Sequence, residues 1–384
     1  MLAAIYPDAV SSSFGFDQFL GNTSAVVHLR RAVAAGRLPN SILISGPAGA
    51  GKYTLTMMIT MALLCERQPR VAHASGDLAD FCGVCRNCER IAESMDLAAR
   101  VEAAVAAREE LRETDKKETR VLVQTHPDVL VLPPDPPQLL VKLGQVRSLI
   151  AGIYRMPAEA KRRVYIFPAS AFMKEAANSL LKVLEEPPAY AHIFLLAEHP
   201  GELLPTIRSR CAAVRLGALP ADEITALLVE QRPQWKPAER ELIARLAQGA
   251  AGRALGFDLP TYLAARTDAL VLLRSAVSDG EHSDLFKTTE TYRAGAEGQQ
   301  KTAAMLSALA GLFEDLLLLR SGVPDRVRNV DLQRELDALA DSVSFAWLEN
   351  AMRGFDAVQG GMRRNLLRSL SLDAFAESLA DARD

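Results

Sequence analysis

A chain of 384 residues is too long for one ordinary core and has room for two or three domains, since domains usually hold about 100 to 200 residues. Hydrophobic residues make up 49% and charged residues 24%, a composition that is typical of a globular protein. The formal net charge of -3 provides no general attraction to phosphate backbones. The composition therefore disfavours a dedicated nucleic-acid binder.

We expect no targeting signal in the first residues of the chain and no membrane span in its apolar runs. The first ten residues, MLAAIYPDAV, contain no positively charged region and no long apolar stretch, as a signal peptide would. No uninterrupted apolar run reaches the roughly 18 residues that a membrane span needs. We therefore expect a cytoplasmic protein with no membrane partner.

The first half of the chain alternates between helix and strand patterns. Helical spacing is found over residues 24–40, 52–65, 143–154 and 174–186. Short apolar runs that are typical of buried strands are found over 41–45, 162–167 and 191–197, and the stretch 125–140 contains a further strand, although four prolines from 133 to 137 prevent regular structure there. Alternating strands and helices predict a parallel sheet flanked by helices. The fold class is therefore α/β in this half of the chain.

Beyond about residue 218 the strand patterns stop and helical patterns continue to the end. We expect an α/β domain over 1–217, a small helical domain over 218–266 and a larger helical domain over 267–384. Within the first domain, residues 89–121 read as a charged, Ala-rich amphipathic helix. We expect this insertion to be a helical segment that is exposed to solvent.

The stretch GPAGAGKYT, which follows the strand at 41–45, resembles a phosphate-binding loop. In such a loop the backbone N–H groups of a glycine-rich turn surround phosphate at the start of a helix, and a lysine adds positive charge. We expect the binding residues to be Gly46, Gly49, Gly51, Lys52 and Thr54.

The loop departs from the pattern at the residue after the lysine. That residue normally places a small hydroxyl on Mg²⁺, but here it is Tyr53, whose oxygen lies on the far side of a ring. Thr54 has a suitable hydroxyl, but it is rotated by about 100° around the helix. Hydrolysis also needs an acid at the end of a second strand, and strand 162–167 is followed by Pro168. We expect magnesium binding to be weak or lost.

Four cysteines form a compact pattern. Cys65, Cys82, Cys85 and Cys88 are spaced as C-x16-C-x2-C-x2-C, and in a reducing compartment such clustering favours a metal over disulfides. Four thiolates form the closed tetrahedron that a structural Zn²⁺ prefers. The sequence therefore predicts a structural zinc site.

The motifs GPAGAGKYT, the four cysteines, HPDV at 126–129, NSLLKVLEEPP at 178–188 and RSRC at 208–211 occur in this order. Together they resemble the bacterial DNA polymerase III clamp-loader subunits, and the defective loop is more similar to the delta-prime type than to the gamma/tau motor. The resemblance implies an AAA+ fold: a RecA-like domain with a zinc module, a helical lid and an all-helical collar.

The resemblance also implies partners and a mechanism. It implies a ring of five subunits with gamma/tau and delta, which loads the sliding clamp onto primed DNA. Ser209, Arg210 and Cys211 match the family's Ser-Arg-Cys motif, whose arginine acts as a finger in the neighbour's ATP site. Binding of ATP or ADP to this chain is expected to be weak and without turnover.

Two further positions support an ATP site that does not hydrolyse ATP in this chain. The resemblance places Glu198 where active relatives have a small hydroxyl sensor, and Gly252 where they have a lid arginine, although a shift of one residue would place Arg253 there instead. The acidic pair Glu185 and Glu186 falls in the last turn of a helix, and we expect it to be solvated or paired with a base of a neighbouring subunit.

The alternatives are an active gamma/tau-like ATPase, in which Thr54 and another acid serve the metal, and a free-standing phosphate-loop enzyme such as a small-molecule kinase. The cysteine module and the helical C-terminal third disfavour the kinase.

Overall fold

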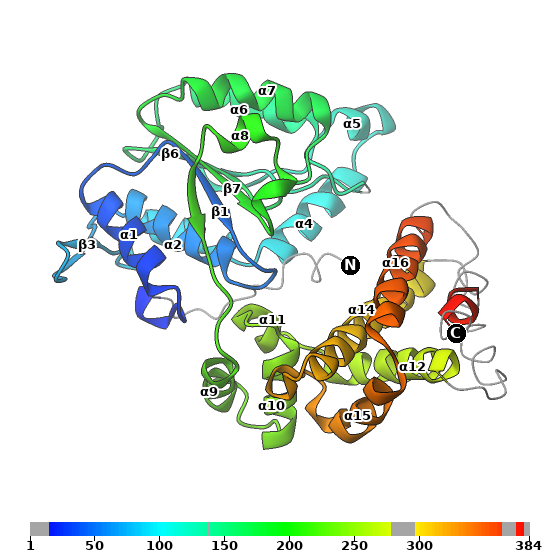
Figure 1. The fold of residues 1–384 in the computed structure, drawn as a ribbon. Coiled ribbons are helices and arrows are strands. Elements are labelled where there is room, and N and C mark those ends of the chain that lie inside the picture. The colour runs from blue at the N-terminus through cyan, green and yellow to red at the C-terminus, as the bar shows by residue number, and fades with distance from the viewer. Residues whose placement is uncertain (1–14, 137, 278–295, 363–373, 380–384) are drawn as a thin grey trace. The chain divides into compact units, whose positions relative to one another are not determined.

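The computed structural model describes residues 15–136, 138–277, 296–362 and 374–379 (Figure 1). The chain forms two compact units. The first comprises Met1–Leu227 and Ala247–Gly256, and the second comprises Leu228–Leu246 and Phe257–Asp384.

The first unit contains a six-stranded sheet in the order β4-β5-β6-β7-β1-β8. Its strands are β1 (Ser41–Ser45), β4 (Val123–His126), β5 (Val129–Val131), β6 (Arg163–Phe167), β7 (Ala191–Ala197) and β8 (Ala212–Arg215). Every neighbouring pair is parallel except β4 and β5, which are antiparallel.

The predicted parallel sheet is therefore confirmed for the four predicted strands, with β5 lying within the stretch 125–140. The sequence did not predict β8, nor that the same stretch also contains the end of β4, which is antiparallel to β5. Only Pro127 and Asp128 separate β4 from β5, and so short a connection can join antiparallel strands but cannot cross over to a parallel one.

Helices cover both faces of the sheet, as Figure 1 shows. All five residues of β1 are buried. Ile42 and Ile44 pack in the same core as α1 and α2, whereas Leu43 packs in the core that contains α6 and α7, as expected for side chains that alternate along a strand. Three of these helices match the predicted ranges to within one residue: α2 (Lys52–Leu64), α6 (Leu143–Ile153) and α7 (Lys174–Glu185). Helix α1 (Thr23–Ala34) begins as predicted but ends at Ala34, before the predicted end at residue 40.

A subdomain of small elements follows α2. It consists of the two-stranded hairpin β2 (Arg70–Val71) and β3 (Leu78–Ala79) and the helices α3 (Arg86–Ala92), α4 (Leu97–Glu109) and α5 (Glu113–Glu118).

The expectation that residues 89–121 form a solvent-exposed helical insertion is wrong for α4. Leu97 and Val101 are 2% and 0% exposed and belong to the core beneath α2. Farther along α4, the Arg108 guanidinium donates to the fully buried carboxylate of Asp135 at 2.5 Å. Two apolar residues four positions apart place one stripe of the helix on the core, although most of its surface is charged.

The 3₁₀ turn η2 (Phe16–Gln18) precedes α1, and three further short elements of the first unit lie near the ends of β1 and β7. They are the helix α8 (Pro205–Arg208), the 3₁₀ turn η3 (Pro200–Glu202) and the short helix α11 (Ala251–Leu255). Helix α9 (Ala221–Gln231) spans the boundary between the two units.

The described part of the second unit is helical. It contains α10 (Pro237–Leu246), α12 (Leu259–Val277), α14 (Ala296–Arg320), α15 (Gln333–Ser342) and α16 (Phe345–Met362). Leu309, Leu312 and Leu316 of α14 are fully buried in one core with Trp347 of α16. Residues Gln300–Arg320 are long and apolar enough to cross a membrane, with a mean hydropathy of 1.6, but half of that window is buried inside this core. The hydropathy of α14 is thus that of a central core helix.

Candidate functional site

The phosphate-like loop connects the C-terminal end of β1 to the first turn of α2. Gly49 and Gly51 have φ angles of 77° and 79°, a left-handed conformation that glycine adopts without strain. A Cβ at Gly51 would also lie 2.9 Å from the Phe19 ring. The strand, the glycine turn and the helix therefore have the order that the sequence predicted.

The residue after the lysine points away from any phosphate site. Tyr53 is 6% exposed and lies in the hydrophobic core, where its hydroxyl donates to the Ser94 carbonyl at 2.7 Å. Thr54 is buried as well. On the second strand, β6 ends at Phe167 and is followed by Pro168. Residue 53 therefore has no hydroxyl available for a metal, and the end of β6 has no carboxylate.

Groups of the loop are also occupied by hydrogen bonds and contacts within the chain. The Lys52 ammonium donates to the carbonyls of Gly46 and Pro47 at 2.7 and 2.8 Å. The Gly252 amide, in α11, donates to the Gly49 carbonyl at 2.9 Å. A Cβ on Gly49 would lie 2.6 Å from the Arg253 nitrogen, so α11 packs directly on the loop.

Arg210 follows the short helix α8 and lies beside the end of α7. Its guanidinium donates to a Glu185 carboxylate oxygen at 2.7 Å and to the Thr206 carbonyl at 2.9 Å. Ser209 donates to the same carbonyl at 3.1 Å. Cys211 is half-buried, and burial raises the pKa of its thiol to about 11. Glu185 is thus paired within the chain, which the sequence did not predict.

The four predicted cysteines come together. The sulfur atoms of Cys65, Cys82, Cys85 and Cys88 all lie within 4.8 Å of one another. Tetrahedral thiolate ligands about 2.3 Å from Zn²⁺ are about 3.8 Å apart, and the sulfurs of Cys65 and Cys85 are 4.0 Å apart. The group could hold a metal ion.

The surroundings of these thiols affect their ionisation in different ways. Burial raises the pKa of Cys65 and Cys88. Burial also opposes ionisation of Cys82, but hydrogen bonds from the Val84 amide and from the Cys65 and Cys85 thiols outweigh it and lower its pKa to about 7. Since a metal ligand must be deprotonated, a bound cation would compensate the cost of buried thiolates.

A hydrogen-bonded link joins the cysteine cluster to the sheet. Asn87, between two of the cysteines, donates to the Leu64 carbonyl at the end of α2 at 2.8 Å, and its side-chain oxygen is 3.0 Å from Nε2 of His126. His126 is fully buried, and burial lowers its pKa. Motif spacing alone could not show this link, because Asn87 and His126 are 39 residues apart.

Asp128 in the HPDV motif fixes a neighbouring loop. Its buried carboxylate accepts the backbone amides of Ala158, Glu159 and Ala160 at 2.7 to 2.8 Å, and Arg163 donates to it at 3.2 Å. Burial opposes ionisation, but these hydrogen bonds outweigh it and lower the pKa of Asp128. The motif is therefore structural in this chain.

We expect Asp128→Ala to destabilise the protein by about 3 kcal/mol, because the buried carboxylate is removed and three partly buried backbone amides and Arg163 lose their acceptor. The exposed Asp77 provides the control, and Asp77→Ala should change the free energy of unfolding by less than about 0.5 kcal/mol. Urea unfolding measures both. A lowered pKa means that the contribution of Asp128 is complete above its ordinary value of 3.8 and is lost as the pH falls through the lower folded value. An equal, small effect of both substitutions would contradict the role of Asp128.

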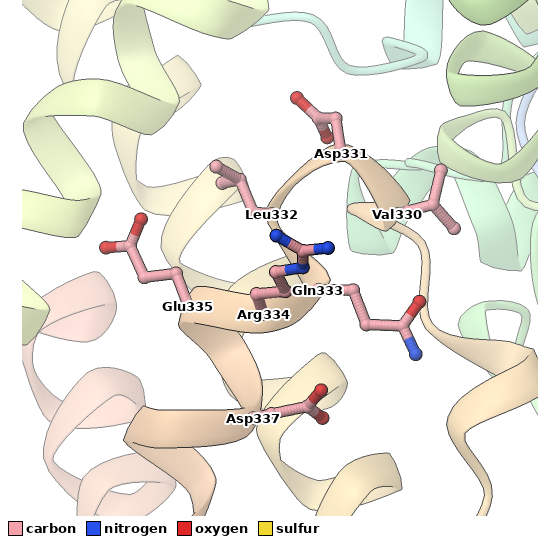
Figure 2. A pocket seen from close by; sticks show the side chains of 7 residues that line it. All are labelled: Val330, Asp331, Leu332, Gln333, Arg334, Glu335 and Asp337. Atoms are coloured by element: carbon pink, nitrogen blue, oxygen red, sulfur yellow. The ribbon is translucent and has the colours of Figure 1, made fainter.

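A surface hollow of about 670 Å³ lies in the second unit, around η5 (Val330–Leu332) and the start of α15. Figure 2 shows that its side chains point in different directions and do not converge on one point. Two of its acids already have partners: Asp331 accepts from Arg266 at 2.6 Å, and Glu335 accepts from Arg274 at 2.7 Å. We assign no ligand to this hollow.

The sheet order and the loop after β1 define an α/β protein of the phosphate-loop class, in which the metal-binding groups of the loop are missing. The family model described as DNA polymerase III, delta subunit, matches residues 21–220. The chain belongs to this family.

Curated relatives carry related names. The DNA polymerase III subunit delta' of Pseudomonas aeruginosa is 32% identical over 173 residues, which cover 45% of this chain and 41% of that protein. The delta' subunit of Escherichia coli is 27% identical over 81% of this chain and 79% of its own length, and the tau subunit of Salmonella typhimurium is 27% identical over 78% and 36%. The chain thus spans well under two thirds of the Pseudomonas and Salmonella proteins. The resemblance to delta-prime subunits is confirmed.

Among solved structures, a gamma subunit-related DNA polymerase III protein of Thermotoga maritima is 18% identical, with a TM-score of 0.41 over 94% of this chain and 100% of that one. This likeness is too weak to add to the comparison.

Proposed function

We propose that this chain is a non-catalytic subunit of the bacterial DNA polymerase III clamp loader. In this role it completes the ATP site of a neighbouring gamma/tau-type subunit and hydrolyses no ATP itself. Its proposed partners are gamma/tau and delta subunits in a five-membered ring, and through that ring the sliding clamp and primed DNA. Its proposed location is the cytoplasm.

The observation that carries the proposal is the loss of both metal contacts. Phosphoryl transfer in this class needs Mg²⁺ held by a hydroxyl next to the lysine and by a strand-end acid. Here the Tyr53 hydroxyl is bonded to Ser94 in the core, and Pro168 occupies the strand end. Since Lys52 is bonded to carbonyls of its own loop, we propose that any nucleotide binding is weak and without turnover.

The proposed role in the ATP site of the neighbouring subunit depends on Arg210. A guanidinium that enters a neighbour's site stabilises charge on the transferring phosphoryl group. Arg210 lies at the surface with its side chain 33% exposed, on a segment that matches the Ser-Arg-Cys motif of the family.

We assign the four-cysteine group to one structural Zn²⁺. The ligand set is closed, which leaves no position for a reacting water. The ion would join the end of α2, at Cys65, to α3, at Cys85 and Cys88.

The runner-up is an active gamma/tau-like ATPase. This chain is 27% identical to both a tau and a delta' subunit, and this favours the runner-up hypothesis. The burial of Tyr53 and Thr54 disfavours it.

Reconstitution separates the two. We expect this chain to copurify with a gamma/tau-type subunit and to raise the ATPase rate of the complex, while a Lys52→Ala variant raises it equally. If Lys52→Ala abolished the gain, this chain's own loop would be active and the runner-up would hold.

A further inference from the structure

We propose that Glu185 is a positioning residue for Arg210, and that it orients the guanidinium for a phosphate of the neighbouring subunit. The inference rests on the proposed function and deepens it, because it names the side chain of this chain that prepares the finger.

The pair joins two rigid elements. Glu185 is the last residue of α7, which is stopped by Pro187 and Pro188. The Asn40 side-chain amide donates to the carbonyls of Pro188 and Ala191 at 3.0 and 2.7 Å. The turn after Glu185 is therefore tied to the start of β7.

The backbone at Arg210 is held in place in a similar way. Ile207, one turn before Arg210, is fully buried in the core that contains Leu184, the neighbour of Glu185. The Arg210 amide also donates to the Ile207 carbonyl at 3.1 Å. Both backbones are thus held by one core, while the two side chains remain exposed.

The hydrogen bonds of Arg210 leave part of its guanidinium group available for a phosphate oxygen. Nη2 donates to Glu185 at 2.7 Å, and Nη1 donates to the Thr206 carbonyl at 2.9 Å, with Ser209 at 3.5 Å. Arginine has five N–H donors, so donors remain for a phosphate oxygen. Because a free arginine loses much rotamer freedom on binding, a side chain that is already oriented loses less when the phosphate arrives.

The position of Glu185 also explains why it pairs with a cation. A carboxylate in the last turn of a helix lies against the negative end of the helix dipole, and the Arg210 charge offsets this repulsion. Glu186 occupies the next position and is equally exposed, so it provides a control with the same charge and nearly the same place.

A double-mutant cycle in the complex reconstituted with a gamma/tau-type subunit tests the inference. We expect Glu185→Ala to lower the hydrolysis rate constant at the neighbouring site about threefold to fivefold, with little change in KM, because an oriented finger acts in the transition state. Glu185→Gln, which keeps an acceptor, should lose less. Glu186→Ala should behave as wild type.

The decisive arm uses the Arg210→Ala background, in which Glu185→Ala should have no further effect. A full effect of Glu185→Ala in that background, or equal effects of Glu185→Ala and Glu186→Ala, would overturn the positioning role and leave the finger in place. If Arg210→Ala itself had no effect, the proposed trans role would fail, and the inference with it. Thermal unfolding of each variant checks that the fold is kept.

Discussion

Arg210→Ala is expected to lower ATP hydrolysis at the neighbouring site by about a thousandfold, the lower end of the range for arginine fingers. The guanidinium would contact the transferring phosphoryl group only in the assembled complex, so the isolated chain should fold normally. Single-turnover hydrolysis in the reconstituted complex measures the effect as a loss of the fast phase at the site that this chain completes.

Arg208→Ala is the matched control, because Arg208 ends helix α8, two residues before Arg210, and is also exposed. We expect this variant to keep the fast phase. A fast phase that survives Arg210→Ala, or that is lost equally in both variants, would show that Arg210 does not reach the transition state.

Removal of the metal is expected to have the largest effect on stability. Structural Zn²⁺ contributes about 10–16 kcal/mol in isolated zinc modules, and here the thiols connect the C-terminal end of α2 to the start of α3. Of the four thiols, only Cys65 lies at α2, at its C-terminal end, and Cys85 and Cys88 lie at the start of α3. We expect metal analysis to give one zinc per chain, and Cys88→Ser, at a fully buried thiol, to lower the melting temperature by more than about 10 °C.

Cys211→Ser provides the control, since Cys211 is the one cysteine outside the cluster. This variant should retain the full zinc content. A freshly purified protein that contains no metal, and whose melting temperature is unchanged by a chelator, would contradict the zinc assignment.

Local patterns predicted the parts of the fold that depend on short-range spacing. The helices that became α2 and α7 were predicted from their apolar periodicity, and α7 ends at Glu185, just before the two prolines that cannot continue it. The cysteine spacing predicted a cluster that the folded chain forms. The helices depend on residues that are neighbours in the sequence, and the cysteines follow a spacing that can be recognised without knowledge of the tertiary structure.

Long-range pairing could not be predicted in this way. The bond from Tyr53 to Ser94 and the pair of Arg210 with Glu185 join residues 41 and 25 positions apart. Similarly, the burial of Val101 in α4 depends on the core beneath it, which the charged composition of 89–121 does not reveal. These contacts depend on tertiary packing, which outweighs the local preference.

The central claim is that this chain cannot fix Mg²⁺ at its own loop. The most direct measurement is ATP turnover by the purified chain alone in the presence of Mg²⁺, with Lys52→Ala as a test for contaminating ATPase. The account predicts that both proteins show the same background rate. Turnover by the wild-type chain at about 1 s⁻¹ or above, the lower end of ordinary enzyme rates, that disappears in Lys52→Ala would contradict it.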